Sequence, residues 1–482
     1  MSEKNDAGSF SPEIKNILWF SAALLPYILF ARNIFAPYYG VIWDNWREHL
    51  PVFSYFALSL DNGFGFPRWF PNDGGVPVGM TFINNFTFKP HELFGYLVYR
   101  LLPVPTPYAY YAALIAGMLS VGAGCWLCLR SLGRSRPAAV IGTWMVLLGG
   151  SGLTVFHQEQ ALATMLYWPW IVLSLLKSRS NINFLPVFGA LCGLALSTHY
   201  PHIHLIGLIF LAGSIAIFHR REAAGCIRYW LGARRNIITT IAGALLALAG
   251  ALPSFYILKN LPDYSSPLRA GGIVTDTLPE YMRLCQPNMS MFPERAKRYL
   301  FPLVPIRKDF DYFNRGIEKS PDEFAPYVTL TGLAFALAAV IFLRMRAGAV
   351  LLFTMLSLWA MLGVHAKFAQ FLFSIHFPAI GGFRQYYHFF PLVNFGLACL
   401  GAFGFDLILD KVTGAATPKP EAGPPRKTPD AYSLRRVLPL LALLPFVFAL
   451  LFESKAFFNR YFDLYLKRSQ PVSMDRIGPS FI

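Results

Sequence analysis

The sequence predicts an all-α, polytopic membrane protein, and two observations support this prediction. Hydrophobic residues make up 55% of the 482 positions and charged residues only 14%, whereas soluble domains carry about 25% charged residues. Apolar segments of about 20 residues, the length that crosses a bilayer as a helix, recur along the chain. A secreted protein, a cytosolic enzyme and a nucleic-acid-binding protein are therefore poor fits.

Eleven segments are apolar enough to be transmembrane helices. The two that flank Pro201 could instead form one broken hairpin. A further apolar stretch, residues 368–377, is too short to cross, and we interpret it as a re-entrant or interfacial helix. The predicted spans are residues 17–37, 108–128, 138–155, 161–176, 184–198, 203–218, 237–258, 327–343, 347–363, 389–409 and 437–453.

The Lys and Arg residues set the orientation of these helices. With the N-terminal residues 1–16 in the cytoplasm, every cytoplasmic connection is basic, as the positive-inside rule requires. Orientation thus explains most of the net charge of +16, and we assign no nucleic-acid partner. The predicted organisation is a transmembrane core over 17–410 with large extracytoplasmic loops 38–107 and 259–325, a Pro-rich cytoplasmic linker 411–436, a last transmembrane helix 437–453 and an extracytoplasmic tail 454–482.

The first candidate site directly follows the first predicted helix. Asp44 lies between two tryptophans, and Arg47 and Glu48 follow it. Tryptophans prefer the headgroup level of a membrane, and a carboxylate partly removed from water there can act as a general base. The alternative is an interfacial loop in which Asp44 caps a helix.

A second candidate is the Gly- and Pro-rich region over residues 61–77. Arg68 offers a cation for a phosphate, and Trp69 and Asp73 are further candidates for substrate binding. Gly-rich turns bring backbone amides close to a ligand. The alternative is a surface turn with Arg68 among the lipid headgroups.

The third candidate combines polar residues at the outer ends of predicted helices. His157 and Glu159 share one connection, and His199 and His202 share the next. Such residues can bind a divalent metal, but no fixed ligand spacing repeats, so a metal or other cofactor is the less favoured interpretation. The two other interpretations are that these residues form hydrogen bonds to a substrate or that they cap the helix ends.

The fourth candidate precedes the tenth predicted helix and contains Arg384, Tyr387 and His388. A cation beside aromatic rings at the outer leaflet suits a lipid phosphate or a sugar face. The alternative is an aromatic belt at the membrane surface. Glu280, in the second large outer loop, adds a carboxylate to the candidate substrate-binding residues.

In this order, the motifs resemble the YfhO-like bacterial membrane proteins, which belong with the family C (GT-C) glycosyltransferases. The resemblance covers about residues 17–410. It rests on an acid soon after the first helix, a Pro- and Gly-rich run, a His-Tyr-Pro-His helix start, a Pro-Glu-Tyr element and a closing helix. The matching positions are Asp44, Pro51, Leu60, Gly63, Pro67, Trp69, Pro71, Gly74, Gly75, Pro77, His199, Tyr200, Pro201, His202, Pro279, Glu280, Tyr281, Pro287, Phe383, Arg384, His388, Phe389, Gly401, Gly404 and Asp406.

The resemblance implies an inverting glycosyltransferase with a polyprenyl-phosphate sugar donor and a cell-envelope glycan or lipid acceptor. The enzyme would act among membrane lipids at the outer face of the bacterial inner membrane. Asp44 would be its catalytic base, and Arg384, with Arg68 in reserve, would stabilise the leaving phosphate.

The alternative is a non-catalytic protein: a transporter or flippase for a lipid-linked glycan, or an envelope-assembly partner. Transporters usually carry ionisable residues within their spans. Here the carboxylates gather in the outer loops instead, which favours chemistry at the membrane surface over passage.

Overall fold

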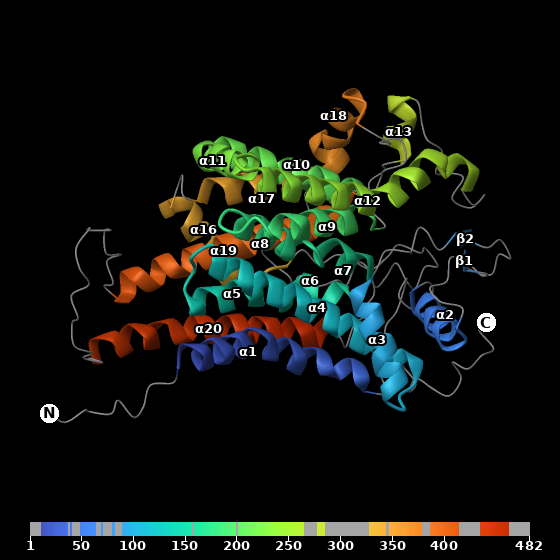
Figure 1. Ribbon diagram of the computed structural model, residues 1–482. Helices are drawn as coiled ribbons and strands as arrows, with labels where there is room; N and C mark the ends of the chain where they lie inside the picture. Colours follow the sequence, from blue (N-terminus) through green and yellow to red (C-terminus); the bar gives the residue numbers. More distant parts are fainter. Residues whose placement is uncertain are drawn as a thin grey trace.

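A computed structural model describes residues 11–36, 39–40, 49–63, 69–70, 80–81, 89–156, 159–198, 201–264, 277–284, 327–343, 347–377, 386–413 and 434–461. These residues form a bundle of helices that run lengthwise beside one another (Figure 1). The one described sheet consists of two-residue strands, with Trp69 opposite Thr81 and Phe70 opposite Met80. The predicted all-α, polytopic membrane fold is confirmed.

Helices account for nearly all of the described architecture. In chain order the first elements are α1 (Pro12–Ala31), η1 (Arg32–Phe35), α2 (Leu50–Asp61), β1 (Trp69–Phe70), β2 (Met80–Thr81), α3 (Pro90–Leu101), α4 (Thr106–Ser131), α5 (Arg136–Leu147), α6 (Gly150–Thr154), α7 (Glu159–Met165), α8 (Trp168–Ser178), α9 (Phe184–Leu196) and α10 (Pro201–Phe218). The remaining elements are α11 (Arg220–Leu231), α12 (Arg234–Tyr264), α13 (Leu278–Leu284), α16 (Leu330–Leu343), α17 (Gly348–Leu362), η6 (Gly363–Ala366), α18 (Phe368–Ser374), η8 (Tyr386–Phe389), α19 (Phe390–Thr413) and α20 (Leu434–Tyr461).

Seven helical segments among the described residues are long and apolar enough to cross a membrane. They are Glu13–Phe35, Thr106–Ser131, Glu159–Ser178, Pro201–Phe218, Arg234–Leu252, Gly348–Ala366 and Tyr386–Val412. The predicted spans 184–198 and 327–343 coincide with the shorter apolar helices α9 and α16, and the predicted last span lies within α20, which continues to Tyr461. On either side of Pro201, α9 and α10 are separate helices.

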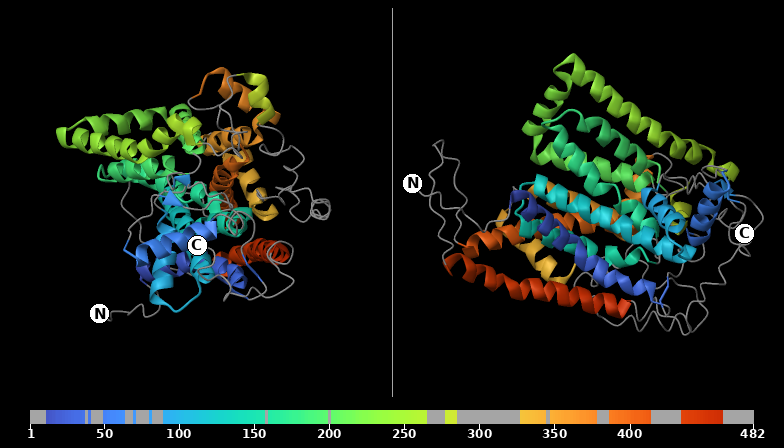
Figure 2. Two further views of the ribbon diagram at one scale, coloured as in Figure 1. Left: turned by 90° about the vertical axis from the view of Figure 1, so that its right-hand side faces the viewer. Right: turned by 60° about the horizontal axis from the view of Figure 1, so that its bottom comes forward.

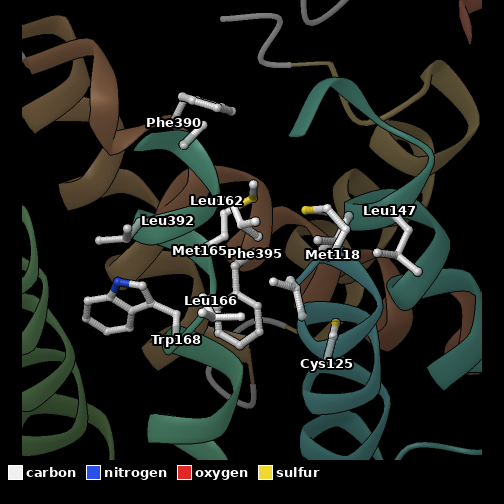
Figure 3. Close-up of a cluster of buried hydrophobic side chains, with 14 of the residues drawn as sticks. Met118, Cys125, Leu147, Leu162, Met165, Leu166, Trp168, Phe390, Leu392 and Phe395 are labelled. Carbon is white, nitrogen blue, oxygen red and sulfur yellow. The ribbon is translucent and has the colours of Figure 1, made fainter. Parts of the chain in front are cut away.

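The centre of the bundle is formed by α4, the segment from α5 to α8, and α19. Met118 and Cys125 of α4 pack with Leu162 and Met165 of α7 and with Phe395 of α19 (Figure 3). At the edge of the bundle α1 and α20 lie side by side (Figure 2), and the ring of Phe458 contacts those of Tyr27 and Phe30. Because lipid tails are as apolar as these side chains, close packing rather than hydrophobic burial holds such helices together.

The predicted span 138–155 is not one helix. It is divided at Gly149 into α5 and α6, and nearly all of its side chains are buried. Polar groups freed by a break must find partners inside the protein, because lipid offers none. The Gly150 N–H donates to the Tyr327 carbonyl (2.7 Å), and the Tyr27 hydroxyl donates to the Gly152 carbonyl (3.0 Å). Neighbouring helices therefore compensate for the break.

Carboxylates fasten helices to one another at two places in the bundle. At the first place Asp406 of α19 accepts hydrogen bonds from the backbone N–H (3.1 Å) and the hydroxyl of Ser135, the residue before α5. At the second place Glu453 of α20 accepts hydrogen bonds from the Leu330 N–H (2.9 Å) and the Thr331 hydroxyl (2.9 Å). The N-terminal turn of α16 is thus capped by a side chain from a helix far along the chain.

Glycines bring α9 and α12 into close contact. A methyl group added at Gly189 would lie 1.9 Å from the carbonyl oxygen of Gly243. One turn further along, a methyl group at Gly193 would lie 3.0 Å from the Cα of Gly250. Glycines four residues apart are typical of closely packed membrane helices.

The substitution Gly189→Ala should therefore push α9 and α12 apart. We expect it to lower the free energy of unfolding by about 1–3 kcal/mol, the usual cost of overpacking. The measurement is a titration with SDS in mixed micelles. Gly213→Ala in α10 is the matched control, because no atom lies within 4 Å of its added methyl group. Equal stability of the two variants would contradict the proposed packing.

Candidate functional site

The described parts of the first large loop gather at one end of the bundle. The helices α2 and α3 and the strands β1 and β2 lie at this end, where α7 also begins (Figure 1). We call it the loop end. It brings together residues that are distant in the sequence: His49 directly precedes α2, Lys89 directly precedes α3, and Glu159 is the first residue of α7.

Glu159 is the centre of a buried cluster of ionisable side chains. Its own side chain is only 1% exposed. The Lys89 ammonium lies 2.6 Å from Oε1, and His91 Nε2 lies 3.2 Å from the same oxygen. The Tyr110 hydroxyl donates to Oε2 (2.8 Å), and His49 Nδ1 lies 3.7 Å from that oxygen. An ammonium and a phenol that both donate to one carboxyl group suit its ionised form.

Lys89 joins a second carboxyl group to the cluster. Its ammonium lies 2.8 Å from Glu92 Oε1, and both side chains are more than nine-tenths buried. The local sequence explains this contact, because Pro90 starts α3 and the first helical turn brings positions 89 and 92 together. We call Glu159, Lys89, Glu92, His91 and His49 the Glu159 cluster.

The surroundings of the cluster decide which loop residues are charged. Burial lowers the pKa of His49 to about 4, although Glu159 opposes the change, and burial also lowers the pKa of His91. Burial alone would lower the pKa of Lys89, but the two carboxylates outweigh it and raise that pKa. At neutral pH the imidazoles are therefore neutral, whereas Lys89 is a cation.

Glu92 differs from an ordinary surface carboxylate. Burial raises its pKa from 4.5 to about 8, in spite of the nearby Lys89 ammonium. Its carboxyl group therefore holds or releases a proton close to neutral pH, which is a property of side chains that transfer protons.

Most of the predicted site residues lie outside the described part of the chain. These are Asp44, Arg47, Glu48, Arg68, Asp73, His157, His199 and Arg384. For Trp69 in β1 and Glu280 in α13 the structure describes the backbone alone. The remaining four, Glu159, His202, Tyr387 and His388, are described with their side chains.

The described helix α13 of the second large loop contacts η8 and α18 through a pair of tyrosines. The hydroxyls of Tyr281 in α13 and Tyr386 in η8 hydrogen bond to each other, and the ring of Tyr281 stacks on Phe373 of α18 with the centroids 5.0 Å apart. Two of the predicted substrate-binding residues are sequence neighbours of these tyrosines. Glu280 precedes Tyr281, and Tyr387, whose ring lies 4.3 Å from that of the buried His388, follows Tyr386.

Sequence reasoning found Glu159 but missed its partners Lys89, His91, Glu92 and Tyr110. A signal was present, because three ionisable residues in the four positions 89–92 precede an apolar helical pattern. Among the residues that the structure describes, no group of three His, Cys, Asp or Glu side chains is placed to hold a metal ion. The cation that the structure does place on Glu159 is the Lys89 ammonium.

Breaking the pair of Lys89 and Glu159 should destabilise the protein, because each single substitution leaves an uncompensated buried charge. We expect Lys89→Met and Glu159→Gln each to lower the free energy of unfolding by about 3–5 kcal/mol. The double variant should lose clearly less free energy of unfolding than the sum of the losses of the two single variants. Unfolding by SDS measures all three, with the exposed Lys455→Met as the control. Additive losses would show that the two side chains do not interact.

The raised pKa of Glu92 predicts a pH dependence. The folded protein binds this proton more tightly than the unfolded chain does, so the stabilisation is complete below pH 4.5 and is lost as the pH rises through about 8. Relative to Glu92→Gln, the wild-type protein should therefore become steadily less stable over this range. Unfolding midpoints of both proteins, measured across it, test the prediction, and parallel curves would refute it.

Several solved chains are similar to this protein, and two of them align with 92% of it. No family model and no curated protein matches it. One is the archaeal oligosaccharyltransferase AglB from Archaeoglobus fulgidus, solved in complex with an inhibitory peptide and a dolichol-phosphate. It is 15% identical, with a TM-score of 0.45 over 92% of this chain and 56% of AglB. The other is the arabinofuranosyltransferase AftD from Mycobacteria, 14% identical, with a TM-score of 0.43 over 92% of this chain and 26% of AftD. This chain therefore spans little more than half the length of AglB and about a quarter of AftD.

Proposed function

We propose that this protein is an inverting glycosyltransferase of the GT-C type. It transfers a sugar from a polyprenyl-phosphate donor to a cell-envelope glycan or lipid acceptor at the outer face of the bacterial inner membrane. The observation that supports this proposal best is the Glu159 cluster at the loop end of the bundle. Burying charged side chains in a membrane protein is costly, and such groups usually serve function.

A lipid-linked donor is supported by the two faces of α3. One face places His91 and Glu92 in the Glu159 cluster, where they are buried. The other exposes Phe94 (46%), Leu97 (47%) and Leu101 (76%). A helix with an apolar exposed face is suited to lie at a membrane surface among lipid chains. An isoprenoid tail could pack along this exposed face.

The proposed chemistry is a single displacement at the anomeric carbon. The acceptor hydroxyl loses its proton as it attacks, the bond to the lipid phosphate breaks, and the configuration inverts. We assign proton removal to Asp44, and stabilisation of the leaving phosphate to Arg384, with Arg68 in reserve. In the sequence Asp44 lies five residues before His49, a member of the Glu159 cluster.

A transporter or flippase for a lipid-linked glycan is the second candidate, and one observation favours it. The segment from α5 to α8 is divided into short helices inside the bundle. Interrupted helices are typical of substrate sites in transporters. Both candidates bind a lipid-linked sugar, but only the enzyme cleaves it.

The substitution Asp44→Asn tests the proposed enzyme. Purified protein receives a radiolabelled polyprenyl-phosphate sugar, and released or transferred sugar is counted. We expect the variant to lose about 10²–10⁴-fold in rate, the usual contribution of a general base, while its stability and donor binding stay unchanged. The control is Asp410→Asn, which should retain full activity. Asp410 is an exposed carboxylate close to the C-terminal end of α19.

Two outcomes would contradict the proposal in different ways. Full activity of Asp44→Asn would remove this residue from the mechanism without removing the enzyme. Tight donor binding by the wild-type protein, without hydrolysis or transfer, would instead support the transporter.

A further inference from the structure

The helix α11 (Arg220–Leu231) connects α10 to α12 at the end of the bundle opposite the Glu159 cluster (Figure 1). None of its residues is buried. It is 12 residues long, too short to cross a membrane. Eight of its twelve residues are exposed and the other four are half-buried. The protein core therefore covers little of this helix.

The side chains of α11 separate into two faces. Arg221 and Arg228, seven residues apart, share one face, and both are exposed. Ile227 (51% exposed) and Leu231 (54% exposed) lie together on another face, four residues apart. Arg220, seven residues before Ile227, begins this second face. A basic face beside a separate face of large apolar residues is typical of helices that lie in the plane of a membrane.

A hydrogen bond joins α11 to a second basic connection. The Trp230 indole N–H donates to the carbonyl oxygen of Ser178, at the end of α8 (3.3 Å). Lys177 and Arg179 flank Ser178, and both are exposed. The contact therefore brings two connections together into one basic surface.

This surface carries a large excess of positive charge. Residues 220–235 contain five arginines and one acid, Glu222, which gives a net charge of +4. Glu222 lies 3.9 Å from His219. Within the described part of the chain, the arginines of this segment have no ion-pair partner. We call the surface the α11 patch, and it consists of Lys177, Arg179, Arg220, Arg221, Arg228, Arg234 and Arg235.

We propose that the α11 patch binds the headgroups of anionic phospholipids in the leaflet opposite the Glu159 cluster. The guanidinium groups pair with lipid phosphates, while Ile227 and Leu231 insert among the acyl chains. Membrane orientation by itself requires basic connections but neither the exposed apolar pair nor the bond between Trp230 and Ser178. The proposal does not depend on the proposed transferase.

The experiment measures the binding of phosphatidylglycerol to the full-length, detergent-solubilised protein by native mass spectrometry. The wild-type protein should bind phosphatidylglycerol much more tightly than phosphatidylcholine, and added salt should weaken the binding. The variant Arg221→Gln/Arg228→Gln should bind about 30-fold more weakly, or about fivefold per arginine. Arg221→Lys/Arg228→Lys keeps both charges and should retain most of the affinity.

The matched control is Arg32→Gln/Arg100→Gln, which removes two exposed arginines from elsewhere in the protein. It should bind phosphatidylglycerol like the wild type. Wild-type affinity in a folded Arg221→Gln/Arg228→Gln variant would overturn the proposal. Should that variant fail to fold, equal affinity of the wild-type protein for the two lipids would overturn it equally.

Discussion

A carboxylate that is withdrawn from water inside a helix bundle needs cations and hydrogen-bond donors around it, and Glu159 places this requirement on distant parts of the chain. Lys89 and His91 come from the start of α3, Tyr110 from α4 and His49 from the start of α2. Glu159 thus links the starts of α2 and α3 to α4 and α7. Without Glu159, the Lys89 ammonium would retain only Glu92 among these carboxylate partners.

Polar groups of the backbone also need partners when they are withdrawn from water, and this requirement explains how the bundle accommodates its irregular backbone. The break between α5 and α6 is surrounded by protein, and the backbone of Tyr327 and the side chain of Tyr27 compensate for it. Asn394 of α19 donates a further hydrogen bond to the Ser151 hydroxyl (2.7 Å). An interrupted helix can thus lie at the centre of a membrane protein because its polar groups are paired within the protein.

The positions of the helices could be predicted from the sequence because hydropathy is a local property, and every predicted span coincides with helical structure. The break at Gly149 was not predicted, although the run of Gly149, Gly150, Ser151 and Gly152 is a local signal for it. Glu159 was predicted from its place at a helix end. Lys89 and Tyr110 were not, because they lie 70 and 49 positions before Glu159 in the sequence and meet it only in the folded protein. Pairing of this kind depends on tertiary structure, which local patterns do not encode.

The cap that Glu453 forms on α16 has a consequence for biogenesis. Glu453 follows Leu330, whose N–H it accepts, by 123 residues. A ribosome that adds 5–20 residues per second needs about 6–25 s to synthesise that interval. During this time the first turn of α16 has emerged without its acceptor and must rely on lipid headgroups, water or the insertion machinery. The cap on α16 therefore forms only after α20 has been synthesised.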